Sequence, residues 1–146
     1  MTKYLETLFI RDLNKLKHEL ELYEDKEALW KTAPGISNSA GNLALHLIGN
    51  LKHFFGAVLG NTGFQRDREA EFNDKNVPYE KIIRDLDETI KIVSETLLRL
   101  SDEQLKSTYP EEVMGKPMNT TFFLFHLLGH LNYHLGQVNY HRRLLS

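Results

Sequence analysis

Residues 122–145 read FFLFHLLGHLNYHLGQVNYHRRLL, the longest apolar segment of the chain with helical character. It contains no proline, its glycines are only Gly129 and Gly136, and Thr120 or Thr121 can cap its start. Most of its other side chains are apolar or aromatic. The sequence therefore predicts a long final helix that carries Phe122 through Leu145.

Two segments upstream predict further helices of different character. Residues 3–30 place apolar side chains at intervals of three and four between charged ones, as an amphipathic helix does. Residues 40–59 follow a capping Asn38 or Ser39 and are apolar nearly all round. We expect that second helix to be surrounded by other elements, and its internal glycines to let a neighbour approach closely.

A third segment has a clear start and end. Pro78 suits the first position of a helix, and the apolar residues that follow it keep one face until about Leu100. Ser101 and Gln104 then have the spacing of a capping box at the start of a short helical turn. The third long helix is therefore followed by a short helical turn, which precedes the final long helix.

Together these segments predict an all-α four-helix bundle, with residues 1–146 forming one domain. Residues 60–77 and 107–119 lack sustained periodicity and are expected to be connecting loops. The rival architecture is an all-helical domain with another connectivity.

Composition excludes several classes of protein. Hydrophobic residues make up 41% of the chain, charged residues 26%, and the net charge is −2, so neither disorder nor nucleic-acid binding is indicated. Charges interrupt every apolar run in residues 1–20, which predicts a cytoplasmic protein without signal peptide or membrane span. The absence of cysteine excludes disulfides, thiolate metal ligands and a cysteine nucleophile.

The final helix carries a polar stripe that indicates a metal site. His126, His130 and His134 recur at every fourth residue, so they share one helical face, which Gln137 and His141 extend. Two imidazoles at that spacing can reach one ion. The alternative is that these histidines are hydrogen-bonded core residues without a metal.

One helix cannot surround an ion, so a third ligand must come from elsewhere. His46 and His53, both on the apolar second helix, are the available candidates. Three histidines would leave a coordination position open for water or substrate. Spacing alone does not choose between the two candidates.

The segments NLALHLIGNL at 42–51 and HLLGHLNYHLGQVNYHRRLL at 126–145 resemble the two signature regions of the DinB-like superfamily. The second segment contains the pattern H-x-x-x-H-x-G-Q. This resemblance implies that His46, His130 and His134 are the metal ligands. His126 then lies one turn before the pair, and His18, His53 and His141 have no role in the family.

The resemblance also implies a fold and an activity. The fold is an up-down-down-up bundle of the DinB/YfiT type, often a homodimer, with a nickel or zinc ion. The activity is that of a thiol-dependent transferase or isomerase that uses bacillithiol or mycothiol. A divalent ion held by three neutral imidazoles could activate such a thiol. The alternatives are a metal-dependent hydrolase and a noncatalytic, stress-associated metal-binding protein.

Other polar and aromatic residues receive weaker predictions. Asn50, Gln137 and Tyr133 are candidates to orient a ligand or a bound water. The charged loop 64–72 is interpreted as a solvated loop, with contact to an anionic substrate or acid–base chemistry as the alternative. The aromatic residues are expected to pack in the core; they are Tyr4, Tyr23, Trp30, Phe54, Phe55, Phe122, Phe123 and Phe125.

Overall fold

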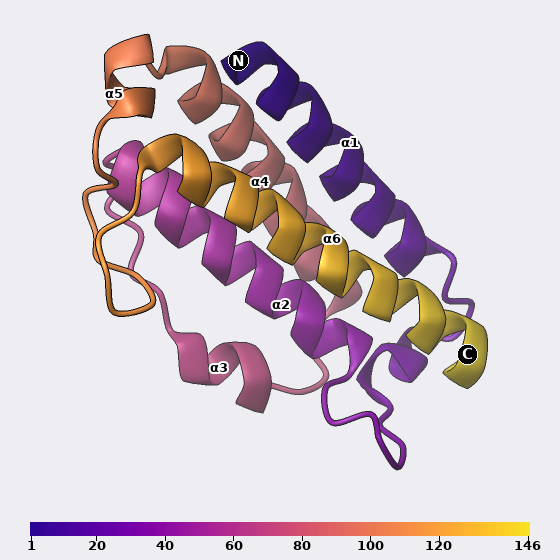
Figure 1. The fold of residues 1–146 in the computed structure, drawn as a ribbon. Coiled ribbons are helices and arrows are strands. Elements are labelled where there is room, and N and C mark those ends of the chain that lie inside the picture. Colours follow the sequence, from indigo (N-terminus) through magenta and orange to yellow (C-terminus); the bar gives the residue numbers. More distant parts are fainter.

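A computed structural model describes residues 1–146 and contains the four long helices that the sequence predicted (Figure 1). The long helices are α1 (Thr2–Glu21), α2 (Ala40–Leu51), α4 (Tyr79–Arg99) and α6 (Thr120–Leu145). The short helices are a 3₁₀ helix (Lys26–Trp30), α3 (Arg68–Asn73) and α5 (Asp102–Lys106), and a π-helix (Lys52–Leu59) continues α2. No named strand is present, so the predicted all-α class is confirmed.

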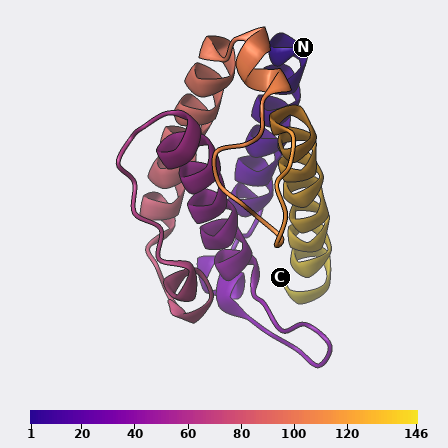
Figure 2. The ribbon, with the colours of Figure 1, turned by 60° about the vertical axis from the view of Figure 1, so that its left-hand side comes forward.

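The long helices form a bundle in which α1 and α6 run in one direction and α2 and α4 in the other (Figure 1). Both α1 and α2 pack against α4 and α6. Seen from the side, residues 107–119 lie across the space between α2 and α6 (Figure 2). Tyr109 holds this loop there, because its hydroxyl donates to the Phe54 carbonyl at 2.7 Å.

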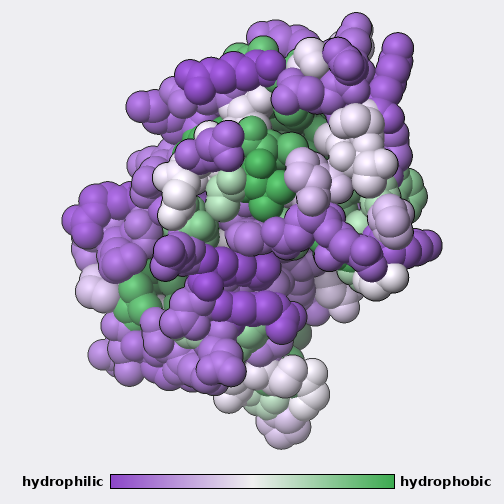
Figure 3. All heavy atoms as spheres, turned by 90° about the vertical axis from the view of Figure 1, so that its left-hand side faces the viewer, coloured by the Kyte–Doolittle hydropathy of each residue, from purple (hydrophilic) through white to green (hydrophobic).

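The core is a continuous cluster of buried apolar residues from all four long helices. Phe9 of α1 and Phe55 of the π-helix meet edge to face, with their ring centroids 5.0 Å apart. Burying side chains of this size stabilises a fold by about 1.5–3 kcal/mol each. The side of the molecule that carries α3 and α5 is, by contrast, mostly hydrophilic with small apolar patches (Figure 3).

The first helix is shorter than its apolar pattern predicted. It ends at Glu21, and residues 26–30 form the separate 3₁₀ helix, so the prediction of one helix over 3–30 was wrong. Lys26 donates to the carbonyls of Leu20 and Tyr23, at 3.2 and 2.6 Å, and so satisfies groups that a helix end leaves open.

The predicted caps were right at two helices and wrong at one. Ser39 caps α2, and Ser101 with Gln104 forms the capping box of α5. The cap of α6 is Asn119, whose side-chain oxygen accepts from the Phe122 amide at 3.2 Å. Thr121 instead donates to the Leu105 carbonyl.

The other boundaries differ only slightly from prediction. Pro78 is the N-cap of α4 rather than its first helical residue. Residues 107–119 are irregular apart from isolated bridges, as expected. The connection at 60–77 contains α3, because the side chain of Asp67 accepts from the Ala70 amide and caps it.

The aromatic residues do not all belong to the core. Tyr23, Phe54, Phe55 and Phe123 are buried, as predicted, and Trp30 packs partly buried against the core. The prediction was wrong for Tyr4, Phe122 and Phe125, which are exposed. None of the helices combines the length and hydropathy that a membrane span requires.

A buried carboxylate joins α1 to α6. Asp12 accepts from Arg11 at 2.8 Å and from Asn132 at 2.8 Å. Burial opposes ionisation, but these hydrogen bonds outweigh it and hold the pKa of Asp12 below its usual value. The ionised side chain therefore fixes how α1 lies on α6.

Asp12→Ala should lower the free energy of unfolding by about 1–3 kcal/mol, because it removes charge-assisted hydrogen bonds from a buried position. The matched control is Asp87→Ala, which removes the exposed pair between Lys17 and Asp87 and should change stability by less than about 0.5 kcal/mol. Urea denaturation of the three proteins measures both values. Equal losses in the two variants would contradict the role given to Asp12.

Candidate metal centre

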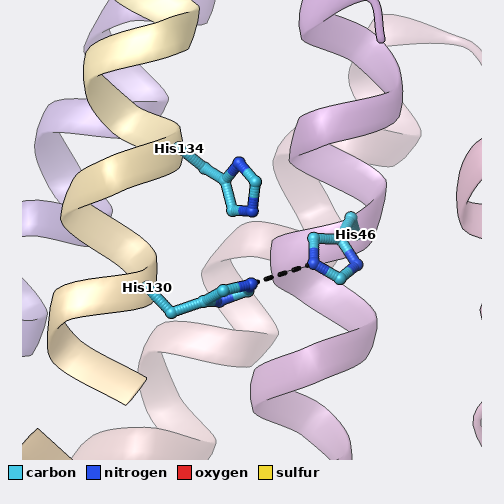
Figure 4. A group of neighbouring side chains, drawn as sticks. All are labelled: His46, His130 and His134. Carbon is cyan, nitrogen blue, oxygen red and sulfur yellow. Dashed lines mark hydrogen bonds between the residues drawn. The ribbon is translucent and has the colours of Figure 1, made fainter. Parts of the chain in front are cut away.

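Three histidines from two helices converge on one point. His46 comes from α2, and His130 and His134 come from α6. One ring nitrogen of each lies within 4.8 Å of the others, and the three rings face a common space (Figure 4). The structure therefore brings together the three residues that were predicted as ligands.

Helix geometry explains this convergence. His130 and His134 are four residues apart on α6, so they lie on one face, with ring centroids 4.6 Å apart. α2 packs against that face, and the His46 ring lies 5.0 Å from His130 and 5.2 Å from His134. The convergence of the three rings therefore depends on the relative position of α2 and α6 along their axes.

The remaining stripe histidines and His53 lie outside the cluster. His53 pairs with Glu111 at 3.0 Å, so of the two candidates for the third ligand only His46 reaches the pair on α6. His126 is exposed one turn before it. His141 bridges the Tyr23 hydroxyl, at 2.6 Å, and the Lys31 carbonyl, at 2.8 Å.

A buried carboxylate orients His46. Glu71 of α3 is only 6% exposed, and its Oε1 accepts from His46 Nδ1 at 2.9 Å. Arg66 donates to both carboxylate oxygens, at 2.8 and 2.9 Å. Burial opposes ionisation of Glu71, but hydrogen bonds from Arg66 and His46 hold its pKa below the usual value. Because Nδ1 carries the shared proton, His46 presents the lone pair of Nε2 to the cluster.

Gly49 makes room for this carboxylate. A Cβ at Gly49 would collide with the Glu71 side chain, so α3 could not lie as close to α2. The expected close approach at a glycine of this helix is thus observed. The interpretation of residues 64–72 as a solvated loop was wrong for Glu71 and Arg66. In the sequence, only Gly49, one turn after His46, indicated that another segment packs closely there.

The two histidines of α6 differ in their partners. His134 Nδ1 donates to the side-chain oxygen of Gln137 at 2.7 Å, which leaves Nε2 as the free acceptor. His130 Nε2 lies 3.0 Å from His46 Nε2, while its buried Nδ1 has no partner. Because His46 Nε2 is an acceptor, His130 Nε2 must donate to it, and a cation between the two nitrogens would replace that proton.

Both histidines of α6 are uncharged at neutral pH. Burial, together with the neighbouring His134 and His46 rings, lowers the pKa of His130 to about 4. Burial also lowers the pKa of His134, although the hydrogen bond to Gln137 opposes this shift. Neither ring therefore carries a positive charge that would repel a cation at neutral pH.

These residues fit a divalent metal ion. Three imidazole nitrogens without a carboxylate suit zinc or nickel, and they leave at least one coordination position open. The short approach between His46 Nε2 and His130 Nε2, at 3.0 Å, is what an ion at this point would resolve. A cavity of about 210 Å³ adjoins His46 and His130.

The residues predicted to orient a ligand have different outcomes. Gln137 contacts His134, as described above. Asn50 is buried beside the cluster, but its side-chain oxygen has no partner. The Tyr133 ring lies 5.2 Å from the His134 ring, and its side chain is exposed to solvent. Glu71, which the sequence offered only as an alternative acid or base in the charged loop, is the residue that orients His46.

The fold and the site define an α-helical bundle with a three-histidine cluster between two of its long helices. The family model of the DinB superfamily matches residues 8–138, and the chain belongs to that superfamily. A crystal structure of a DinB-like protein from Bacillus cereus ATCC 10987 is similar in fold, with a TM-score of 0.70 and 20% sequence identity. That match covers 90% of this chain and 84% of the other. No protein of curated function matches the sequence.

Glu71→Gln should lower the affinity of the protein for zinc by about 10- to 100-fold. The neutral amide holds the His46 ring less firmly than the carboxylate does, and it makes the imidazole a weaker metal ligand. Competition with a chromophoric chelator measures the affinity. Glu69→Gln on the exposed side of α3 is the matched control and should bind zinc as the unaltered protein does. If both variants keep full affinity, Glu71 does not support a metal ligand.

Proposed function

We propose that this protein is a divalent-metal-dependent enzyme that activates a low-molecular-weight thiol at His46, His130 and His134. The convergence of three imidazole nitrogens within 4.8 Å, next to a cavity, is the observation that carries the proposal. Zinc or nickel is the ion that these donors suit. The reaction class is transfer or isomerisation of a small electrophilic substrate.

The chain itself lacks a nucleophilic thiol, because it has no cysteine. A divalent ion with an open position supplies positive charge that lowers the pKa of a bound thiol or water. The protein's own residues hold the site in shape: Glu71 fixes the ring of His46, and Gln137 fixes the ring of His134. An external thiol would then provide the nucleophile.

A hydrolase has less support from the geometry. Direct attack by water requires a side chain that can take its proton. Glu71 is the carboxylate that contacts the cluster, and Arg66 and His46 already occupy both of its oxygens. It is therefore poorly placed to act as a general base.

We also propose that the protein is a homodimer, with α6 at the interface. One face of α6 leaves large apolar side chains exposed, and Gly129 and Gly136 lie between them with open space around them. A second copy could approach closely at these glycines and cover the neighbouring rings. The exposed side chains are Phe122, Phe125, Tyr133, Tyr140 and Leu144.

Replacing both His130 and His134 by alanine should abolish the binding of a metal ion, expected at one per chain. Only the His46 imidazole of the cluster would remain, and one ligand cannot hold the ion. Elemental analysis of the purified protein measures the metal content. His18→Ala removes an exposed histidine outside the cluster and should leave the content unchanged. An equal metal content in all three proteins would refute the site.

Adding low-molecular-weight thiols to the cobalt-substituted protein should produce a thiol-to-metal charge-transfer absorption, because the open position is expected to accept the sulfur atom. Turnover in the presence of an active thiol should disappear on chelation and return with metal. If no thiol in a broad panel changes the spectrum, the thiol-dependent activity is wrong. A noncatalytic metal-binding protein would also show no turnover.

Phe125→Glu should convert the dimer to a monomer, because it places a charge among the apolar side chains of the proposed interface. Sedimentation velocity measures the oligomeric state. Tyr4→Glu, at an exposed aromatic residue of α1, is the control and should remain a dimer. A monomeric unaltered protein would contradict the proposal.

A further inference from the structure

Two buried side-chain polar atoms lack a hydrogen-bond partner, and both lie beside the histidine cluster. They are Nδ1 of His130, on α6, and Oδ1 of Asn50, on α2 one turn after His46. Both residues line the same cavity. Because buried polar groups are nearly always paired in folded proteins, two unpaired atoms at one place require a common explanation.

The other two histidines of the cluster each have a partner that fixes the ring. His46 Nδ1 donates to Glu71, and His134 Nδ1 donates to Gln137, so both rings keep Nε2 for a metal ion. Histidines that bind a metal almost always donate their second ring N–H to such an acceptor. His130 is therefore the ligand of the cluster whose acceptor has still to be identified.

The position of the ring proton explains why the two unpaired atoms do not bond to each other. His130 Nε2 donates to His46 Nε2 at 3.0 Å, which leaves His130 Nδ1 as an acceptor. Asn50 Oδ1 is also an acceptor, and two acceptors cannot form a hydrogen bond. An ion on His130 Nε2 would replace the proton there, and the neutral ring would then carry its proton on Nδ1. Nδ1 becomes a donor, which an amide oxygen can accept.

The other side chains around the cavity are poorer partners for this donor. Arg66 and Arg68 can only donate, and no carboxylate lines the cavity. The His126 ring stacks on Phe123, with ring planes 16° apart, and it is exposed to solvent. The amide oxygen of Asn50 is thus the buried side-chain acceptor that is free to bond to His130.

We infer that Asn50 is a positioning residue of the metal centre, whose side-chain oxygen accepts from His130 Nδ1 when His130 Nε2 binds the ion. The inference deepens the proposed function and rests on its metal site. Each of the three ligands then has its own acceptor: Glu71 for His46, Asn50 for His130 and Gln137 for His134. Binding of the ion removes two unpaired acceptors from the interior, so Asn50 raises the affinity for the ion.

The affinity for zinc tests the role of Asn50. Asn50→Leu keeps a side chain of similar size without an acceptor, and it should lower the affinity by about 10- to 100-fold. Competition with a chromophoric chelator measures the affinity. His126→Ala is the matched control, because it removes the other uncharged polar ring along the cavity outside the cluster, and it should bind zinc as the unaltered protein does. Full affinity in Asn50→Leu, or a loss confined to His126→Ala, would overturn the inference.

Urea denaturation with and without zinc separates positioning from packing. In the absence of zinc, Asn50→Leu removes an unpaired buried amide and should unfold at no lower urea concentration than the unaltered protein. At one fixed concentration of free zinc the variant should unfold earlier, because weaker binding stabilises the folded state less. A loss of the same size under both conditions would mean that Asn50 only packs in the core, and it would refute the inference.

Histidine ¹⁵N NMR follows the ring proton in the unaltered protein and needs no variant for its first step. The proton of His130 should be on Nε2 without zinc and on Nδ1 with zinc. In the zinc-loaded protein, this Nδ1–H should exchange with solvent about three- to tenfold faster in Asn50→Leu, because the hydrogen bond that protects it is lost. Zinc bound to Nδ1, or an exchange rate that Asn50→Leu leaves unchanged, would contradict the inference.

None of these measurements uses a thiol, so they fail independently of the thiol assay. If zinc binding depends on Asn50 but no thiol band appears on the cobalt protein, the thiol-dependent activity fails and the role of Asn50 holds. If the band appears and Asn50→Leu binds zinc with full affinity, only the role of Asn50 fails. A protein that binds no zinc at its histidine cluster would refute both.

Discussion

The packing of α2 against α6 is the constraint on which the site depends. It brings the Nε2 atoms of His46 and His130 to 3.0 Å from each other. A slip of one residue along either helix would rotate its side chains by about 100° and move them by about 1.5 Å. The convergence would then be lost, although both helices would remain apolar and helical. The site thus needs a more exact helix register than the core does.

The connection at 60–77 supplies the side chains that orient His46 in the cluster formed by α2 and α6. α3 inserts Glu71 against His46, and Gly49 leaves the room for it. Arg66 neutralises the buried carboxylate and lines the neighbouring cavity with the same side chain. One short segment therefore links the orientation of a ligand histidine to the shape and charge of the space in front of it.

The sequence predicted what depends on local pattern. Periodicity located the four long helices, and the stripe on residues 126–134, with the resemblance, selected the three histidines. The end of α1 could not be predicted, because the Lys26 side chain that satisfies it folds back from outside the helix. The role of Glu71 could not be predicted for the same reason: its burial depends on the path of the chain after α2, and four charged residues, 66–69, come shortly before it. The exposure of Phe122 and Phe125 depends on which face of α6 the bundle covers.

X-ray absorption spectroscopy of the zinc- or nickel-loaded protein shows whether three imidazole nitrogens hold one divalent ion. We expect three imidazole ligands at about 2.0–2.1 Å, together with an exchangeable oxygen ligand that is replaced by sulfur when a thiol is added. A coordination shell without the multiple scattering of imidazole, or one that is unchanged when His46 is replaced by alanine, would contradict it.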